Sequence, residues 1–275
     1  MHFCILALLL IVFGCSGLED AEKEKLKKAN AIGERIYRTH EEVLFAIEEP
    51  KPYTRPAYPW EINEVGGLSR ITKEFFRCKG SNQNTPQTKT ANGQSVYTFD
   101  CGGMTQHSLP YKEGKEIIYP ALIELLNYIQ DKTQKKVVVT CGHRCPTHNT
   151  YADHSKANQG SKHMIGAEVD FYVKGLEWRP QVVINLIMEY YKKHPTLRHD
   201  PKCAEFIRYE QATNVSTPPW HNKEVFIKFY TKDEGRDLDN NHDYPYFSLQ
   251  LKWDRDKNEP ITYTWAKAFN GYLRY

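Results

Sequence analysis

Apolar residues recur along the chain with two different periods, which together predict a mixed fold. In residues 119–129 they lie three and four positions apart, as is typical of an amphipathic helix. Residues 180–191 predict a second helix, which opens on a proline. Short apolar or alternating runs predict strands at 137–140, 167–173, 205–209, 225–230 and 246–252. Helices and strands do not alternate regularly, so we expect an α+β class with one antiparallel sheet flanked by helices.

A polar segment, residues 80–95, separates two short apolar runs. The runs cover residues 75–78 and 96–99, and each is long enough for a short strand. They predict a pair of strands that encloses the polar segment as an insert.

The N-terminal residues predict export rather than a part of the fold. Residues 3–13 form an apolar run that is too short to span a bilayer and has the length of a signal-peptide core. The run ends at Gly14 and Cys15, which resembles a bacterial lipoprotein processing site at which Cys15 is lipidated. The run lacks a preceding Lys or Arg, and a plain secretory signal or an apolar N-terminal helix are the alternatives.

Three regions follow from these patterns. We expect a signal peptide over 1–14, a lipid-anchored helical spacer over 15–60, and a domain with a C-terminal extension over 61–275. The spacer prediction rests on a charged stretch, residues 18–49, with a helical apolar stripe. The protein would then lie in the cell envelope, attached to the membrane through its lipid anchor.

The charge balance argues against nucleic acid as a partner. The formal net charge is +3, and no block of Lys or Arg stands out along the chain. Nucleic-acid binding would require a basic patch or stripe.

The segment from Ser161 to Asp170 carries the most specific chemistry. It reads Ser-Lys-His-Met-Ile-Gly-Ala-Glu-Val-Asp, with His163 and Asp170 on either side of Gly166. Imidazole and carboxylate are ligands that suit zinc, and the glycine allows a sharp turn between them. A loop histidine followed by a strand carboxylate that caps a turn is the alternative interpretation.

Residues upstream of this segment add a second motif. A buried strand leads into Gly142, Arg144 and a turn that ends at Asn149. Together the two motifs resemble the zinc peptidases of the D-alanyl-D-alanine carboxypeptidase and L-alanyl-D-glutamate endopeptidase family, over roughly residues 116–230. That family carries S-x-H-x-x-G-x-A-x-D after a strand and a Gly-x-Arg turn. Glu168 departs from the pattern, because the family usually has Ala there.

The resemblance implies a zinc ion bound by His163, Asp170 and a histidine on a later strand. Trp220-His221 is the only Trp-His pair in the chain, and it makes His221 the expected third ligand. His242 is the alternative.

The expected general base is less well matched. Many family members have glutamate three residues before the last histidine, where this chain has Pro218. Glu224, three residues after His221, is the first candidate for the base. Glu168 is the second candidate because it shares a strand face with Asp170; Glu210 and Asp243 also remain open.

The resemblance also implies the activity. Arg144 would bind a substrate carboxylate or polarise the scissile carbonyl, and Ser161 would hydrogen-bond the substrate. An internal ion pair is the alternative role for Arg144. We therefore expect hydrolysis of an amide bond in peptidoglycan stem peptides, either as a carboxypeptidase or as an endopeptidase. A non-catalytic zinc-containing envelope protein that binds peptidoglycan or peptide is the alternative, and Pro218 supports it.

The cysteines outside the N-terminal region should pair if the protein is exported. Cys78 and Cys101 flank the polar segment, and we expect a disulfide between them. Either Cys141 or Cys145 would pair with Cys203. A cysteine zinc site matches known spacings poorly, and no signature of a catalytic cysteine surrounds these residues.

A calcium loop is a further possibility near the C-terminus. Asp237, Asp239, Asn241 and Asp243 alternate as oxygen ligands, but the EF-hand pattern is incomplete.

Overall fold

The computed structural model describes residues 21, 24–25, 63–91, 94–153 and 160–275. The chain divides into two units, Met1–Pro56 and Ala57–Tyr275, and every element below belongs to the second. The predicted signal peptide, the lipidated Cys15 and nearly all of the predicted spacer lie outside the described residues. Among the residues that are described, no helix is long and apolar enough to cross a membrane.

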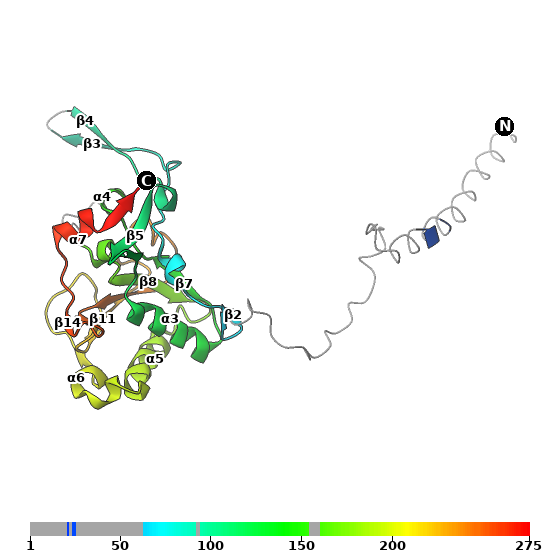
Figure 1. Ribbon diagram of the computed structural model, residues 1–275, viewed down its shortest axis with the longest axis vertical. Coiled ribbons are helices and arrows are strands. Elements are labelled where there is room, and N and C mark those ends of the chain that lie inside the picture. Colours follow the sequence, from blue (N-terminus) through cyan, green and yellow to red (C-terminus); the bar gives the residue numbers. More distant parts are fainter. Residues whose placement is uncertain (1–20, 22–23, 26–62, 92–93, 154–159) are drawn as a thin grey trace, which may run out of the picture. The chain divides into compact units, whose positions relative to one another are not determined.

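The second unit is built on a six-stranded sheet in which all neighbouring strands are antiparallel (Figure 1). Its order is β7-β8-β12-β11-β10-β9. The strands are β7 (Val137–Cys141), β8 (Glu168–Val173), β12 (Tyr246–Leu251), β11 (Val225–Tyr230), β10 (Trp220–His221) and β9 (Ile207–Arg208).

The two faces of the sheet have different compositions. Odd-numbered residues of β8, such as Val169 and Phe171, are fully buried in the main apolar core. Even-numbered residues point to the opposite face, because side chains alternate along a strand. On β8 these are Glu168, Asp170 and Tyr172, so this strand presents two carboxylates on the face away from the apolar core.

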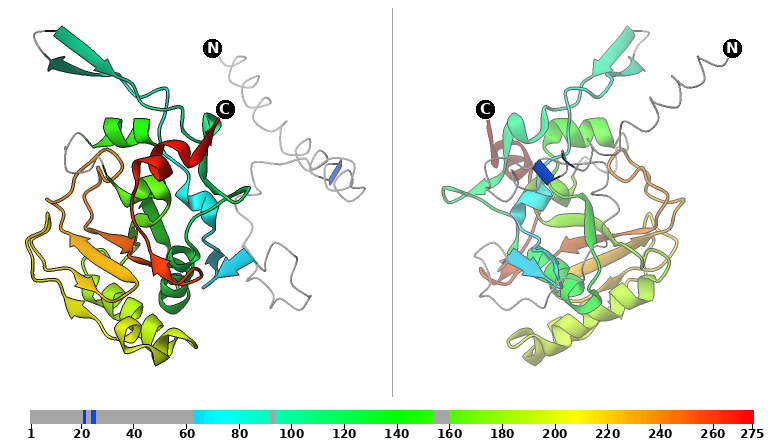
Figure 2. Two further views of the ribbon diagram at one scale, coloured as in Figure 1. Left: turned by 60° about the vertical axis from the view of Figure 1, so that its left-hand side comes forward. Right: turned by 90° about the vertical axis from the view of Figure 1, so that its right-hand side faces the viewer.

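Two helices cover the apolar side, α3 (Pro120–Thr133) and α5 (Pro180–Lys193), and they pack against each other (Figure 2). Each begins at a proline, whose missing N–H is not needed in the first turn. Their inward stripes are buried and include Leu122, Leu125, Leu126, Ile129, Val183, Ile187 and Tyr191.

A second, three-stranded sheet has the order β15-β5-β6 and ties the C-terminus to the middle of the chain. It consists of β5 (His107–Lys112), β6 (Lys115–Glu116) and β15 (Tyr272–Arg274), with α7 (Trp265–Asn270) before its last strand. The predicted C-terminal extension is therefore an integral part of this fold.

The remaining elements are short. Three are hairpins, formed by β1 (Glu64–Val65) with β2 (Leu68–Ser69), β3 (Gln87–Ala91) with β4 (Gln94–Thr98), and β13 (Trp253–Asp254) with β14 (Glu259–Pro260). The short helices are η3 (Lys73–Phe76), η4 (Gly103–Thr105), α4 (Pro146–Ala152), η6 (Lys162–Ile165), η7 (Leu197–His199) and α6 (Pro201–Ala204).

Mixed helices and antiparallel sheets agree with the predicted α+β class, and the principal helices and strands lie where periodicity places them. The predicted strand at 96–99 is largely confirmed by β4, but its predicted partner at 75–78 is wrong. Residues 75–78 do not form a strand, because η3 occupies Lys73–Phe76. The strand β4 pairs instead with β3, which lies inside the polar segment itself. Alternating Thr residues in that segment provide the β-propensity that its polarity obscures.

Candidate metal-binding pocket

A tight turn after β7 brings the chain close to η3 and to His163. Gly142 lies so close to η3 that a Cβ atom there would be 2.4 Å from the Cα of Phe76 and 2.7 Å from its carbonyl oxygen. The backbone N–H of His143 donates to that same oxygen at 2.7 Å. Only glycine fits this approach, and the turn points the Gly142 carbonyl at His163.

His163 lies in η6, where one contact holds its backbone and another orients its ring. Its backbone N–H donates to the side chain of Ser161, the N-cap of η6. Its ring Nδ1 lies 2.7 Å from the carbonyl oxygen of Gly142. A carbonyl can only accept, so Nδ1 carries a proton and Nε2 is the nitrogen available to a ligand. Gly166, at φ +71°, then turns the chain into β8.

Two carboxylates of β8 flank this Nε2. Asp170 Oδ1 lies 3.4 Å from it, and Glu168 Oε1 lies 3.6 Å from it. The other oxygen of Asp170 accepts a hydrogen bond from Asn240 Nδ2 at 2.9 Å. Asp170 Oδ1 is buried and has no hydrogen-bond partner among the described residues. A buried carboxylate oxygen without a donor is a strong site for a cation.

The charges around His163 favour a cation at the same point. Burial lowers the pKa of this imidazole, but the neighbouring Glu168 and Asp170 side chains hold it well above its ordinary value of 6.5. Burial raises the pKa of the Cys141 thiol to about 12, so this thiol is uncharged at neutral pH and adds no attraction. A pocket that attracts a proton to Nε2 also attracts a metal ion in its place.

The described residues thus include a group that could hold a metal ion at this place. Cys141, His163 and Asp170 offer ligand atoms that all lie within 4.8 Å of one another. The Cys141 sulfur lies 3.4 Å from Nδ1, on the opposite side of the ring from Nε2. The atoms that face an ion at Nε2 are therefore those of Asp170 and Glu168.

This site opens into a polar cavity of about 280 Å³. Its lining comprises Arg144, Asp153, Gly160, Ser161, Lys162, His163, Glu168, Asp170, Lys228, Asp237, Gln250 and Tyr263. Four residues expected at the site from the sequence, and the alternative base Glu168, therefore share one cavity. A larger cavity of about 840 Å³ lies beside α3 and contains none of them.

Arg144 lines the cavity, but carboxylates already hold its guanidinium group. Its Nε donates to Asp239 at 2.7 Å and one terminal nitrogen donates to Asp237 at 2.7 Å. The alternative role, an internal ion pair, is the one that these contacts describe. The same bonds make the calcium loop wrong, because Asp237 and Asp239 face a cationic side chain instead of forming an oxygen cage.

His221 is not brought to this pocket, and its expected role as third ligand is wrong. It lies on β10, which β11 and β12 separate from β8. Three strand spacings of about 4.8 Å place it about 14 Å from the pocket strand. Its ring lies against Phe226 and Tyr209, and Nδ1 is 3.2 Å from Lys252 Nζ.

The strand β12, which neighbours β8 on the side toward β10, offers no histidine at the site. Ser248 of β12 pairs with Asp170, and Gln250 pairs with Glu168. Both side chains donate to Glu168 Oε1 at 2.7 Å. The alternative ligand, His242, lies against Tyr172, Tyr244 and Tyr246.

Glu224 is also absent from the pocket, and its expected role as general base is wrong. It is buried beneath α5, where Tyr191 donates to one of its oxygens at 2.5 Å. Arg255 forms a bidentate pair with it, with both distances 2.7 Å. Glu224 is a structural partner of Arg255, and Glu168 is the candidate base that reaches the site.

The predicted disulfide between Cys78 and Cys101 is not present. Their sulfur atoms lie 3.7 Å apart, and all five cysteines of the described residues are unpaired. Cys203 lies next to Asp200, away from Cys141 and Cys145. Sequence reasoning also missed Asn240, whose contact with Asp170 spans 70 positions in the chain.

Comparison of the chain with known protein families, with curated proteins and with solved structures finds no match in any of the three.

Proposed function

We propose that this protein is an exported metal-dependent hydrolase that cleaves an amide bond in peptidoglycan stem peptides. The observation that carries the proposal is that His163 Nε2 lies 3.4 Å from Asp170 Oδ1, a buried oxygen that accepts no hydrogen bond from the described residues, in a polar cavity. The motif resemblance and the apolar N-terminal run supply the substrate class and the export.

The donor set fits a zinc-like ion. Two ligand atoms, each about 2.0–2.2 Å from a tetrahedral ion, lie roughly 3.3–3.6 Å apart, which matches both contacts of Nε2. The ligands would be His163 and Asp170, and Glu168 is near enough to complete the site or to act on it. A bound divalent ion would supply Lewis acidity toward the substrate carbonyl.

The chain's own residues have separate tasks in this scheme. Gly142 holds His163 through Nδ1, and Asn240 holds Asp170 through its second oxygen. Glu168 can accept a proton from an attacking water and return it to the leaving amine. Lys228 at the cavity lining gives a positive charge for a substrate carboxylate.

A second function, peptide binding without turnover, has its own supporting observation. A catalytic zinc site has three protein ligands, and the expected third ligand His221 and the first candidate base Glu224 both lie elsewhere. Ser248 and Gln250 occupy the neighbouring strand instead. The same cavity would then hold a stem peptide without cleaving it.

One experiment separates the two functions. The full chain, loaded with zinc, is incubated with purified muropeptides, and products are followed by liquid chromatography and mass spectrometry. We expect a new amine and a new carboxylate terminus, lost with a chelator and lost in His163→Ala. Glu168→Gln should lower the rate by about 10²-fold or more.

His221→Ala is the matched control, since that side chain is a half-buried histidine on β10, outside the cavity. It should retain activity. If the wild-type chain binds muropeptides by calorimetry and releases no product, the binding function replaces hydrolysis. If it neither binds nor cleaves them, both functions fail.

A further inference from the structure

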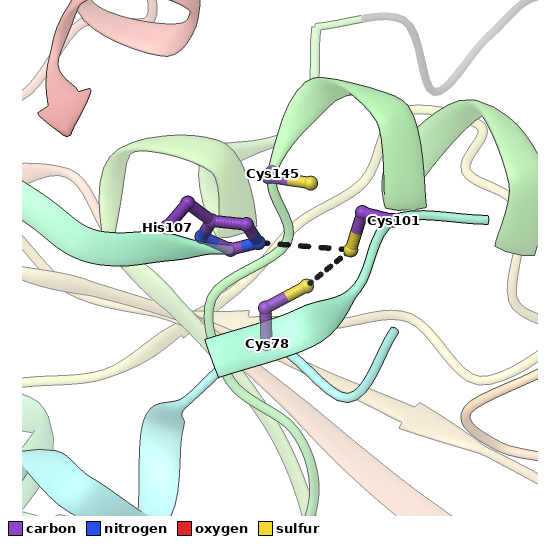
Figure 3. A group of neighbouring side chains, drawn as sticks. All are labelled: Cys78, Cys101, His107 and Cys145. Atoms are coloured by element: carbon purple, nitrogen blue, oxygen red, sulfur yellow. Dashed lines mark hydrogen bonds between the residues drawn. The ribbon is translucent and has the colours of Figure 1, made fainter. Parts of the chain in front are cut away.

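Four potential metal ligands from four separate segments meet in a group that does not line the His163 cavity. Cys78 follows η3, Cys101 follows the β3–β4 hairpin, His107 begins β5, and Cys145 is the N-cap of α4. Figure 3 shows the three sulfur atoms and the His107 ring directed toward a common point. Their ligand atoms all lie within 4.8 Å of one another.

The spacing of these atoms matches a tetrahedral zinc site. The sulfur atoms of Cys78 and Cys101 lie 3.7 Å apart, and the Cys101 sulfur lies 3.6 Å from His107 Nε2. With Zn–S near 2.3 Å and Zn–N near 2.0 Å, tetrahedral geometry predicts about 3.8 Å and about 3.5 Å for these pairs. A disulfide would instead require about 2.05 Å between sulfur atoms.

Neighbouring polar groups favour the histidine tautomer and the thiolate form that bind metal. His107 Nδ1 lies 2.9 Å from the carbonyl oxygen of Ser108, so Nδ1 is the protonated nitrogen and Nε2 faces the sulfurs. Backbone N–H groups of Gly103 and His148 donate to the sulfurs of Cys101 and Cys145, each at 3.3 Å. Such donors stabilise thiolates over thiols.

We propose that Cys78, Cys101, His107 and Cys145 bind a structural zinc ion. Three thiolates and one imidazole complete a four-coordinate sphere, which leaves no position for water or substrate. The site is separate from the His163 pocket, and it does not depend on the proposed hydrolysis.

A zinc ion at this site would stabilise the part of the His163 pocket that contains Arg144. Cys145 directly follows Arg144, and Cys101 directly follows Asp100. Asp100 contacts His148 Nδ1 at 2.6 Å, and His148 Nε2 contacts Asp239, a partner of Arg144, at 3.1 Å. The other three ligands lie far from Cys145 in sequence. Without metal, the four segments that carry the ligands would lose the bonds that join them.

The test is metal content and cobalt spectroscopy of the full chain purified under reducing conditions. His163→Ala should retain about one zinc ion per chain. The substitution removes the pocket site, whereas the cysteine site keeps all four of its protein ligands. Replacement of that zinc by Co²⁺ should give thiolate-to-cobalt charge-transfer bands and the strong visible bands of a tetrahedral ion. Cys145→Ser made in the same background should lose the metal and these bands.

Cys203→Ser is the matched control, a buried cysteine outside the cluster, and it should keep the metal. Because Cys145→Ser can fail to fold, the unaltered chain is also tested directly. Chelator treatment should expose three further reactive thiols and lower the melting temperature by about 10 °C or more.

Two results would overturn the proposal. One is cobalt-loaded His163→Ala protein without thiolate charge-transfer bands. The other is a Cys78–Cys101 disulfide found by mass spectrometry in metal-free, folded protein.

Discussion

At the scale of single residues, His148 is an informative group because both of its ring nitrogens face carboxylates. Nδ1 lies 2.6 Å from Asp100 and Nε2 lies 3.1 Å from Asp239. Both nitrogens can donate only when the ring is charged. Burial lowers its pKa, but the bonds with Asp239 and Asp100 outweigh burial and raise the pKa above 6.5.

This arrangement predicts the sign of a pH effect on stability. A pKa that is raised in the folded state adds stability that is complete below about pH 6.5 and is lost as the pH rises through the folded value. We expect His148→Gln to lower the free energy of unfolding by about 1–3 kcal/mol near pH 6, and by less near pH 9. Urea unfolding of zinc-saturated wild type and variant measures the difference. A difference that grows with pH would contradict the assignment.

Glu224 gives a second prediction at this scale. It is 1% exposed, and Arg255 and Tyr191 both bond to its carboxylate. Glu224→Gln should cost about 2–3 kcal/mol of stability, because a charged partner of Arg255 is lost. Muropeptide turnover by the folded variant should equal that of the wild type. Equal stability together with lost turnover would return Glu224 to the role of general base.

Part of the residue-level site could be predicted because its residues lie close in sequence. Ser161, His163 and Asp170 belong to one short motif, and the side-chain alternation of a strand placed Glu168 beside Asp170. His221 and Glu224 could not be placed in the same way. Their positions depend on which strands lie between β10 and β8, and no local pattern encodes that order.

At the scale of elements, the turn between β7 and α4 depends on close backbone contact. Gly142 approaches the backbone of Phe76 more closely than any Cβ atom permits. Gly142→Ala should therefore push η3 away and cost about 2–4 kcal/mol. It should also weaken metal binding at His163, whose Nδ1 depends on the Gly142 carbonyl.

Gly160→Ala is the control for this prediction. Among the described residues, a Cβ atom at Gly160 would meet the Tyr263 ring at 3.5 Å, which is an ordinary contact. Thermal unfolding and zinc titration of both variants provide the measurement. Equal stability of the two variants would show that the β7 turn tolerates a side chain.

The elements themselves were largely predictable, and the reason is that their signals are local. The apolar stripe of α3 and the buried run of β7 lie within each element. Only β3 was missed in the hairpin, because its sequence Gln-Thr-Lys-Thr-Ala has no apolar alternation, whereas β4 contains the apolar run that begins at Val96. The C-terminal strand β15 has no distinctive pattern, and only its pairing with β5 identifies it.

At the scale of the whole molecule, a chain of side-chain contacts joins the cysteine cluster to the pocket. Its members in order are Asp100, His148, Asp239, Arg144, Asp237, Asn240 and Asp170. The cluster was not predictable from sequence, because its ligands lie in four segments whose spacing follows no known zinc pattern. The turn after β7 carries residues of both sites: Arg144 lines the pocket, and Cys145 belongs to the cysteine cluster.

The most direct test of the central claim is an anomalous difference map at the zinc edge, from crystals of the zinc-loaded full chain. We predict one peak bonded to His163 Nε2 and Asp170 Oδ1, and another among Cys78, Cys101, His107 and Cys145. A fully zinc-loaded crystal with no peak at His163, or with its second zinc bound by His221, would contradict the account.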